Sequence, residues 1–123
     1  MTESLLKVAC VQMNSCADID RNIDKACAYI REAAGKGAQF IATPENTCYM
    51  KYPLSKKRDT TPKEQDHSGL PVFSALAKDL GITLLIGSIC IHNEEDKIIN
   101  RSYLFNAQGK TQDRKSTRLN SSH

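Results

Sequence analysis

The stretch Phe40-Ile41-Ala42-Thr43-Pro44-Glu45-Asn46 decides the fold, because a short apolar run ends there in a proline and a carboxylate. Proline cannot donate a hydrogen bond to a sheet, and it restricts the preceding residue to extended conformations. The strand is therefore predicted to end at Thr43 and to hand Glu45 to a loop. Because α/β enzymes keep their chemistry at strand ends, Glu45 is the first candidate for a catalytic acid or base. The alternative is that Glu45 caps a turn or is simply solvated in the loop.

A strand and a helix are predicted before this stretch. Residues 6–13 are mostly apolar and suit a strand buried on both faces. Asp18 or Asp20 can cap a helix that Gly35 and Gly37 end. Its apolar residues recur at three- and four-residue steps: Ile19, Ile23, Ala26, Cys27, Ile30 and Ala34. With a second strand over residues 38–43, the order strand, helix, strand predicts a parallel crossover unit.

Another helix and two more strands are predicted after it. Residues 46–70 form a long polar stretch, which predicts a functional loop with one helical turn at most. Pro71 suits a first helical position, and Gly81 suits the end of that helix. Residues 82–91 predict a third strand, and residues 98–105 predict its antiparallel partner.

Gly87-Ser88 interrupts the apolar run of the third strand. A glycine inside a strand lets another group approach the backbone closely, because there is no side chain in the way. We therefore expect a close backbone contact at Gly87.

The composition excludes several classes of protein. A chain of 123 residues with 40% hydrophobic and 25% charged residues is typical of one ordinary globular domain. The net charge of +3 is modest, and its basic residues are scattered without interleaved aromatic residues, so no nucleic-acid partner is expected. No apolar run approaches the length of a membrane span, and no secretory leader is apparent, so we expect no membrane association.

Five cysteines stand at irregular spacing, without a Cys-x-x-Cys pair. This pattern predicts reduced thiols in the cytoplasm and no zinc site. Cys10, Cys27 and Cys90 lie in apolar stretches, where cysteine behaves as a small core residue. Cys48 lies three residues after Glu45 and could in principle be activated by it as a nucleophile, although we expect no such role.

A series of short motifs extends from residue 6 to about residue 112. In chain order they are Val8-Ala9-Cys10-Val11-Gln12-Met13, Asn22, Gly37-Ala38, Thr43-Pro44-Glu45-Asn46, Gly81-Ile82, Gly87-Ser88, Asn100-Arg101-Ser102 and Gly109. Their order and spacing resemble the N-terminal part of carbon–nitrogen hydrolases of the nitrilase superfamily. The sequences Gln12-Met13 and Pro44-Glu45-Asn46 are more similar to those of the small amidase branch than to those of true nitrilases. That branch includes ω-amidases and deaminated glutathione amidases.

The resemblance implies an α/β fold that is the N-terminal half of an α-β-β-α sandwich. In such enzymes a Glu, a Lys and a Cys meet at the sheet ends, and the Cys attacks an amide carbonyl to form a thioester. By resemblance Glu45 is the Glu, the substrate is a small carboxylated amide, and neither a metal nor an organic cofactor is required. Tyr49 and Tyr52 either line the substrate pocket or are simple packing contacts. A homo-oligomer is implied for the full-length parent.

The chain departs from the family where the catalytic Lys is expected. Family spacing puts this Lys eight residues after Gly109, and that position is Thr117. Lys110 and Lys115 are nearby, but neither stands in the Tyr-x-Lys context of the family, and both suit solvated side chains. The nucleophilic Cys would follow later still. We therefore expect the chain to be truncated and inactive alone, with uncovered apolar surface that favours aggregation.

Residues 114–123 differ from the family pattern and resemble the translation of a sequencing-library adapter. We predict a partial hydrolase domain over residues 1–113 and an artefactual or disordered tail over residues 114–123, a genuine disordered C-terminus being the alternative. A second hypothesis for the whole chain is a short non-catalytic paralogue. It would bind a partner through an exposed sheet edge at residues 100–105.

Overall fold

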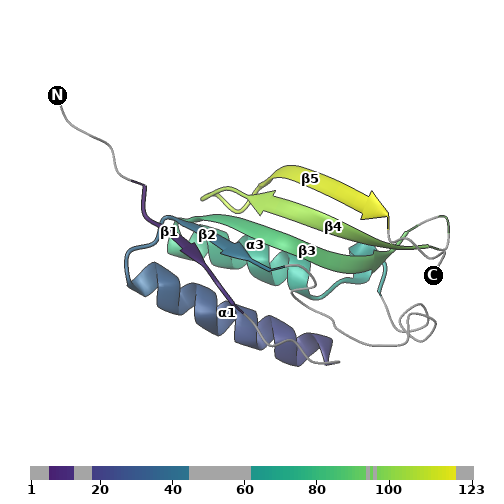
Figure 1. The fold of residues 1–123 in the computed structure, drawn as a ribbon, viewed down its shortest axis with the longest axis horizontal. Coiled ribbons are helices and arrows are strands. Elements are labelled where there is room, and N and C mark those ends of the chain that lie inside the picture. Colours follow the sequence, from purple (N-terminus) through teal and green to yellow (C-terminus); the bar gives the residue numbers. More distant parts are fainter. Residues whose placement is uncertain (1–5, 13–17, 45–61, 94, 96, 119–123) are drawn as a thin grey trace.

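The computed structural model describes residues 6–12, 18–44, 62–93, 95 and 97–118. They form one mixed sheet in the order β1-β2-β3-β4-β5, with two α-helices on one face (Figure 1). The strands are β1 (Val8–Cys10), β2 (Phe40–Thr43), β3 (Thr83–His92), β4 (Ile98–Phe105) and β5 (Thr111–Arg118). The helices are α1 (Ile19–Gly35), α3 (Gly69–Leu80) and the short 3-10 helix η1 (Glu64–Asp66). β1, β2 and β3 pair in parallel, whereas β4 pairs antiparallel with both β3 and β5. This confirms the α/β class.

Helix α1 begins where the cap was predicted. Asp18 is the capping residue, and its Oδ1 accepts a hydrogen bond from the amide of Arg21 at 3.2 Å. After the last turn, Gly37 takes a φ of 94°, which a residue with a side chain rarely adopts. The ammonium of Lys7 donates to the carbonyl of Lys36 at 2.7 Å, so a cation lies at the negative end of the helix dipole.

Helix α3 begins two residues earlier than predicted, at Gly69 rather than Pro71. Proline is tolerated there because amides in the first helical turn have no partner within the helix. Nδ1 of His67 accepts the amide hydrogen of Gly69 at 3.0 Å and so satisfies one of these free donors. Gly81 ends the helix with a φ of 63°, as predicted. Within the described part of the 46–70 stretch, η1 provides the expected helical turn.

Strand β1 is shorter and more exposed than predicted. The side chain of Val8 is 54% exposed, and Cys10 is exposed as well, so burial on both faces was the wrong expectation. The physical reason is position: β1 lies at the edge of the sheet, and the helices cover only one face. Cys10 is therefore no core residue, whereas Cys90 is buried and Cys27 is partly buried.

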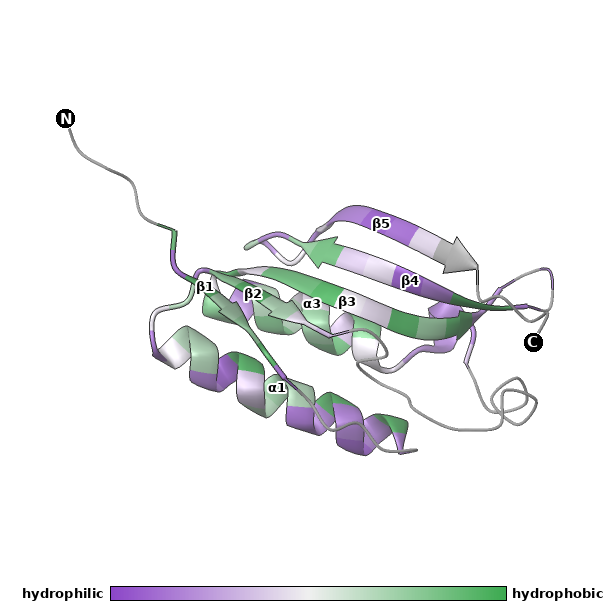
Figure 2. Cartoon of the chain, in the orientation of Figure 1, coloured by the Kyte–Doolittle hydropathy of each residue, from purple (hydrophilic) through white to green (hydrophobic). Residues whose placement is uncertain are grey.

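The hydrophobic core fills the space between the sheet and the two helices. Ile30 of α1 and Phe73 of α3 pack in it with Ile41, Leu84 and Ile86 of the two central strands, all fully buried. Figure 2 shows the corresponding apolar bands on β2 and β3 and on the sheet-facing sides of the helices. Each such side chain stabilises the fold by about 2 kcal/mol relative to exposure.

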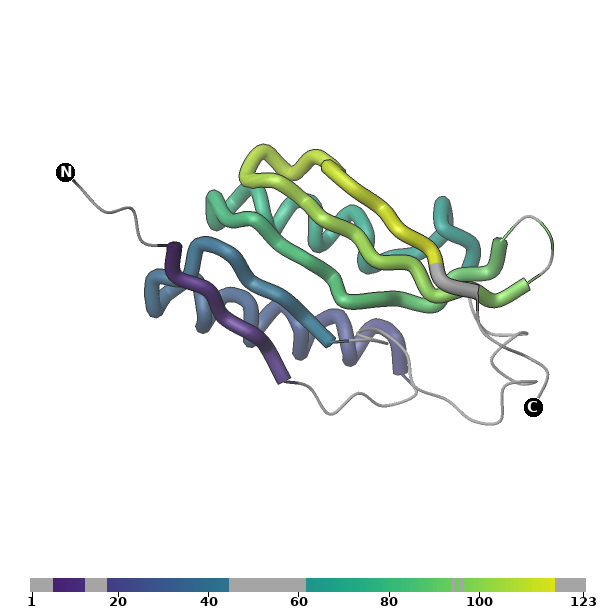
Figure 3. The backbone as a smooth tube through the Cα atoms, turned by 45° about the horizontal axis from the view of Figure 1, so that its top comes forward, coloured from purple at the N-terminus to yellow at the C-terminus, as the bar shows by residue number. Residues whose placement is uncertain are grey.

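The opposite face of the sheet carries a second set of apolar side chains. Strand alternation and register place Phe40, Leu85 and Leu104 there, beside Val8 and Cys10 of β1. Figure 3 shows this face turned forward, with both helices behind it. No described helix covers it, and we call it the bare face.

Strand β5 changes the edge of the sheet. Residues 98–105 do not form an exposed edge, because β5 pairs with β4 along its length. The edge strand is instead β5, which carries Asp113, Arg114 and Lys115 and is strongly hydrophilic (Figure 2). Charged side chains discourage further strand pairing, so the predicted docking edge at residues 100–105 is wrong.

Residues 114–118 belong to β5, although the sequence placed them in a tail outside the domain. Pairing with β4 through the main chain requires no apolar side chains, which is why a polar segment can adopt this structure. Residues 114–118 thus have regular strand structure, and whether they are part of the natural sequence stays a prediction. The domain boundary at residue 113 stays a prediction.

In the described residues, no helix has both the length and the apolar character needed to cross a membrane.

Candidate functional site

The carboxyl ends of the parallel strands meet at one edge of the sheet. β1 and β2 run side by side to this edge, where the amide of Val11 donates to the carbonyl of Ala42 at 2.9 Å. β2 ends at the buried Thr43, and Pro44 follows as the first residue outside the strand. This confirms that the Thr-Pro pair ends the strand, at the kind of edge where α/β proteins bind ligands.

Pro44 leaves the sheet across Gly87 of β3. A Cβ atom added to Gly87 would lie 2.3 Å from the carbonyl oxygen of Thr43, and 2.7 Å from both the carbonyl carbon and the oxygen of Pro44. These distances are far shorter than van der Waals contact, and all three atoms belong to the main chain. The close backbone approach predicted at Gly87 is therefore confirmed, and its partner is the chain that leads into residue 45.

The predicted site residues themselves lie outside the described part of the chain. Glu45, Tyr49 and Tyr52 all fall in the interval 45–61, as does Cys48. Their assignment as catalytic acid or base and as substrate-binding residues stays a prediction. What the structure places is the main chain immediately before them, at Pro44.

The two lysines near the expected catalytic position lie at the β5 edge of the sheet, which is the opposite edge from β1. Lys115 is exposed on the edge strand β5, where it pairs in register with Ser102. Lys110 is exposed in the turn before β5, and Thr117 pairs in register with Asn100. An exposed lysine is stabilised as a cation by water, which agrees with the solvated role expected of both.

A charged cluster joins η1 to the last two strands. One Glu64 carboxylate oxygen accepts from Arg101 at 2.5 Å and from the hydroxyl of Tyr103, and the other accepts from Arg114 at 2.7 Å. Burial alone raises the pKa of Glu64, but the hydrogen bonds from Tyr103 and Arg101 and the two guanidinium charges outweigh it, so the pKa lies below its ordinary value. Burial and the Glu64 carboxylate raise the pKa of Tyr103.

This cluster is suited to a structural role rather than to proton transfer. A carboxylate with a lowered pKa and three donors holds no proton near neutral pH and is a poor base. Two cavities of about 440 and 350 Å³ flank Glu64 and Arg114. The sequence did not predict the cluster, since Arg101 and Glu64 stand 37 residues apart. A hint was Arg101 itself, a lone charge in an otherwise uncharged strand.

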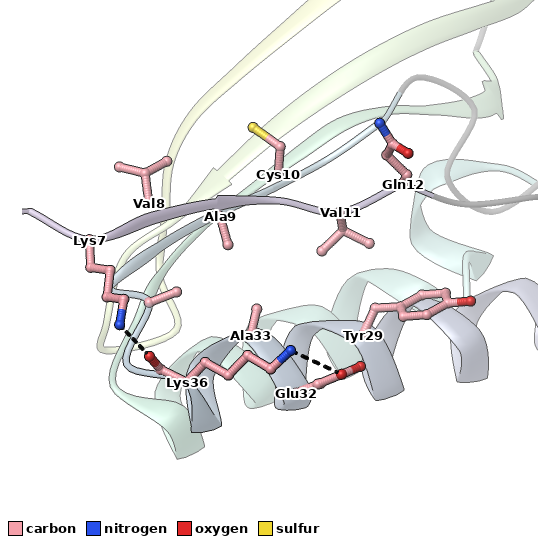
Figure 4. A pocket seen from close by; sticks show the side chains of 11 residues that line it. Lys7, Val8, Ala9, Cys10, Val11, Gln12, Tyr29, Glu32, Ala33 and Lys36 are labelled. Carbon is pink, nitrogen blue, oxygen red and sulfur yellow. Dashed lines mark hydrogen bonds and ion pairs between the residues drawn. The ribbon is translucent and has the colours of Figure 1, made fainter.

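A third cavity, of about 410 Å³, lies between β1 and α1 (Figure 4). Ala9 and Val11 point into it from the strand, and Tyr29 borders it from the helix. The ammonium of Lys7 is already bonded to the carbonyl of Lys36 at its rim. Among its described lining residues, Glu32 is paired with Lys36 and Cys10 points away from the helix, so we assign this cavity no catalytic role.

The described residues contain no group of three or more His, Cys, Asp and Glu side chains that could hold a metal ion. In the Glu64 cluster, the charged partners of the carboxylate are the guanidinium groups of Arg101 and Arg114. Two guanidinium groups would repel a metal ion from that carboxylate.

Comparison with known proteins adds a family to this geometry. The model of the carbon-nitrogen hydrolase family matches residues 7–120. The chain is 38% identical over 92 residues to omega-amidase NIT2-B of Xenopus laevis, covering 72% of this chain and 31% of that protein. It is 31% identical over 107 residues to human omega-amidase NIT2, covering 84% of this chain and 36% of that protein. The chain thus spans about a third of the length of these relatives.

Solved structures show the same arrangement of strands and helices. Nit3 of Saccharomyces cerevisiae, a member of branch 10 of the nitrilase superfamily, superposes with a TM-score of 0.77 at 28% identity, covering 91% of this chain and 44% of that one. An amidase from Nesterenkonia sp. superposes with a TM-score of 0.78 at 22% identity, covering 93% and 43% respectively. The latter likeness concerns the fold alone.

Proposed function

This chain belongs to the carbon–nitrogen hydrolase family, and we propose that it is the N-terminal part of an amidase that hydrolyses a small carboxylated amide. The observation that carries the proposal is the position of Thr43-Pro44 at the carboxyl ends of the parallel strands, directly before Glu45. That omega-amidases are among its relatives supports the proposal of an amide, rather than a nitrile, as the substrate class. A binding paralogue is not favoured, because β5 covers the edge on which that hypothesis relied.

The proposed chemistry uses Glu45 twice. It first accepts the proton of the nucleophilic thiol, so that the sulfur attacks the amide carbonyl and forms a tetrahedral intermediate. The C–N bond then breaks, Glu45 returns the proton to the departing ammonia, and a thioester remains. Water attacks the thioester and gives up a proton to Glu45. The C–S bond then breaks, Glu45 returns this proton to the thiolate, and the carboxylic acid product leaves. A lysine would stabilise both oxyanions as a point charge.

The lysine and the nucleophilic cysteine of this scheme have no assigned counterpart in the present chain. We therefore propose that the 123-residue chain has no hydrolase activity by itself, because one member of a three-residue site supplies neither nucleophile nor oxyanion stabilisation. For the complete enzyme we propose a homo-oligomer located in the cytoplasm.

Sequencing of the source gene across codon 113 tests the truncation. A reading frame that continues into a Tyr-x-Lys segment and a later strand-end Cys would support it. A genuine stop codon after His123 would contradict it and leave a non-catalytic chain.

Glu45→Gln tests the catalytic assignment in the longest natural chain that contains residues 1–113. Loss of a general acid and base should lower kcat for ammonia release from small carboxylated amides by about 100- to 10,000-fold. The melting temperature should stay unchanged, because Gln has the same size and keeps a polar side chain. Cys48→Ser serves as the matched control and should retain turnover. Full activity of Glu45→Gln, or loss of activity in Cys48→Ser, would contradict the assignment.

A further inference from the structure

Gly87 lies at an irregularity between β3 and β4. The register of the two strands shifts between Ile86 and Ile89, so that Gly87 and Ser88 fall outside the regular pairing. At this point the hydroxyl of Ser102 donates to the carbonyl of Gly87 at 2.6 Å. A side chain of β4 thus takes over the role that a main-chain donor has elsewhere in the ladder.

The N–H group of Gly87 is bonded by a residue of its other neighbouring strand, β2. Its N–H donates to Oγ1 of Thr43, the last residue of β2, at 3.3 Å. One residue of β3 is therefore linked to β2 through its N–H group and to β4 through its carbonyl group. We call this three-residue set, Thr43, Gly87 and Ser102, the Gly87 clamp.

We propose that the Gly87 clamp positions the main chain from which Glu45 emerges, with Gly87 and Ser102 as positioning residues for catalysis. Contact with Gly87 sets how closely Thr43 and Pro44 approach β3, because a Cβ there would overlap three of their main-chain atoms. Residue 45 is attached directly to the carbonyl carbon of Pro44, so a displacement of that atom is passed on to it. The inference rests on the proposed function only for its catalytic consequence.

The requirement for glycine here is spatial and not conformational. Gly87 is absent from the glycines with positive φ, which among the described residues are Gly37, Gly81 and Gly109. Any residue can therefore adopt the backbone angles found at Gly87. The effect of a substitution comes from contact with Thr43 and Pro44. This makes Gly87→Ala a specific probe of the contact.

The chain offers a matched control at Gly35. No heavy atom lies within 4 Å of a Cβ added at Gly35, near the end of α1. Gly35→Ala introduces the same methyl group without contact, and alanine also favours the helix. Ser102→Ala removes the hydroxyl donor with little change in volume, and Ser102→Thr keeps that donor on a strand-compatible side chain.

Heteronuclear NMR of the longest natural chain that contains residues 1–113 tests the geometric part without any need for activity. Gly87→Ala should shift the resonances of Thr43, Pro44 and Glu45, whereas Gly35→Ala should leave them unchanged. If Gly87→Ala prevents folding, Ser102→Ala decides the question, with smaller shifts at the same residues that Ser102→Thr reverses. Unchanged resonances at residues 43–45 in a folded clamp variant would overturn the inference.

Kinetics of the longest natural chain test the catalytic part. Because a misplacement of about 1 Å costs on the order of 100-fold in rate, Gly87→Ala should lower kcat by about that factor with little change in KM. Ser102→Ala should lower kcat less, and Ser102→Thr should restore it. If Glu45→Gln is fully active, the proposed function fails regardless of the clamp. If Glu45→Gln is inactive while Gly87→Ala and Ser102→Ala keep the original kcat, the clamp proposal alone fails.

Discussion

At the level of single residues, His67 shows how burial and a hydrogen bond fix a protonation state. Its side chain is 3% exposed, and Nδ1 accepts the amide hydrogen of Gly69, so this nitrogen carries no proton in the folded chain. Burial lowers the pKa of His67 from its usual 6.5, because the charged imidazolium loses solvation. Protonation would also remove the acceptor that caps α3.

The protein should therefore lose stability in mild acid. Because the folded pKa of His67 lies below the unfolded value of 6.5, the unfolded chain binds the proton more readily. The stabilising contribution is fully present above pH 6.5 and is lost as the pH falls toward and through the lower folded pKa. Thermal melts of the longest natural chain that contains residues 1–113, taken from pH 7.5 to 5, should show a falling melting temperature.

His67→Asn is the control for this pH dependence. The amide oxygen of asparagine can accept the Gly69 hydrogen but does not titrate in this range. The melting temperature of His67→Asn should vary less between pH 7.5 and 5 than that of the original chain. An equally steep decline in both proteins would show that other groups cause it.

At the level of elements, the Glu64 cluster attaches η1 to the sheet. Glu64 bonds to Arg101 on β4, and close by the amide of His92 on β3 donates to the carbonyl of Pro62 at 2.8 Å. The side chain of Arg101 is 19% exposed, so its charge depends on the carboxylate more than that of Arg114, which is 53% exposed. The described residues directly after the interval 45–61 are thus held by the two ion pairs of Glu64 and by a main-chain hydrogen bond.

Glu64→Gln should loosen this attachment. Loss of the carboxylate leaves the Arg101 guanidinium without its charged acceptor, which costs about 1 to 3 kcal/mol for a partly buried group. Hydrogen exchange at the His92 amide should accelerate, because its acceptor at Pro62 lies next to the altered segment. The exposed neighbour Gln65 provides the control, since Gln65→Ala should leave the exchange rate unchanged. Unaltered exchange in Glu64→Gln would contradict the proposed attachment.

At the level of the whole molecule, the helices and the bare face make the chain one-sided. Both helices lie against the same face of the sheet (Figures 1 and 3). The register of β3 and β4 places Leu85 and Leu104 side by side on the other face. Among the described residues no helix covers this face, and Phe40, Leu85 and Leu104 are partly exposed on it. Monomeric soluble proteins rarely expose contiguous apolar patches of this kind.

The isolated chain should therefore self-associate and bind hydrophobic dyes such as ANS. Leu85→Lys places a charge at the centre of the bare face and should reduce both light scattering and dye fluorescence. Val72→Lys adds the same charge on α3, where Val72 is 41% exposed, and should change neither signal. A monodisperse original chain that melts cooperatively and binds no dye would contradict this prediction.

The sequence was sufficient for features that depend on neighbours along the chain. The cap at Asp18, the helix end at Gly81 and the strand end at Thr43 follow from local rules of hydrogen bonding and backbone conformation. The close approach at Gly87 was also predicted, since a glycine within an apolar strand indicates a contact. The motifs around these positions were enough to indicate the family.

The partners in those contacts depended on the tertiary structure. Which backbone meets Gly87, which carboxylate neutralises Arg101 and which face of the sheet is bare all involve segments that are distant in sequence. Residues 114–118 pair with β4 despite their polar composition, because main-chain hydrogen bonds do not depend on side-chain type. A sequence pattern indicates that a side chain is buried or that another backbone comes close. Only the tertiary structure determines which residues make that contact.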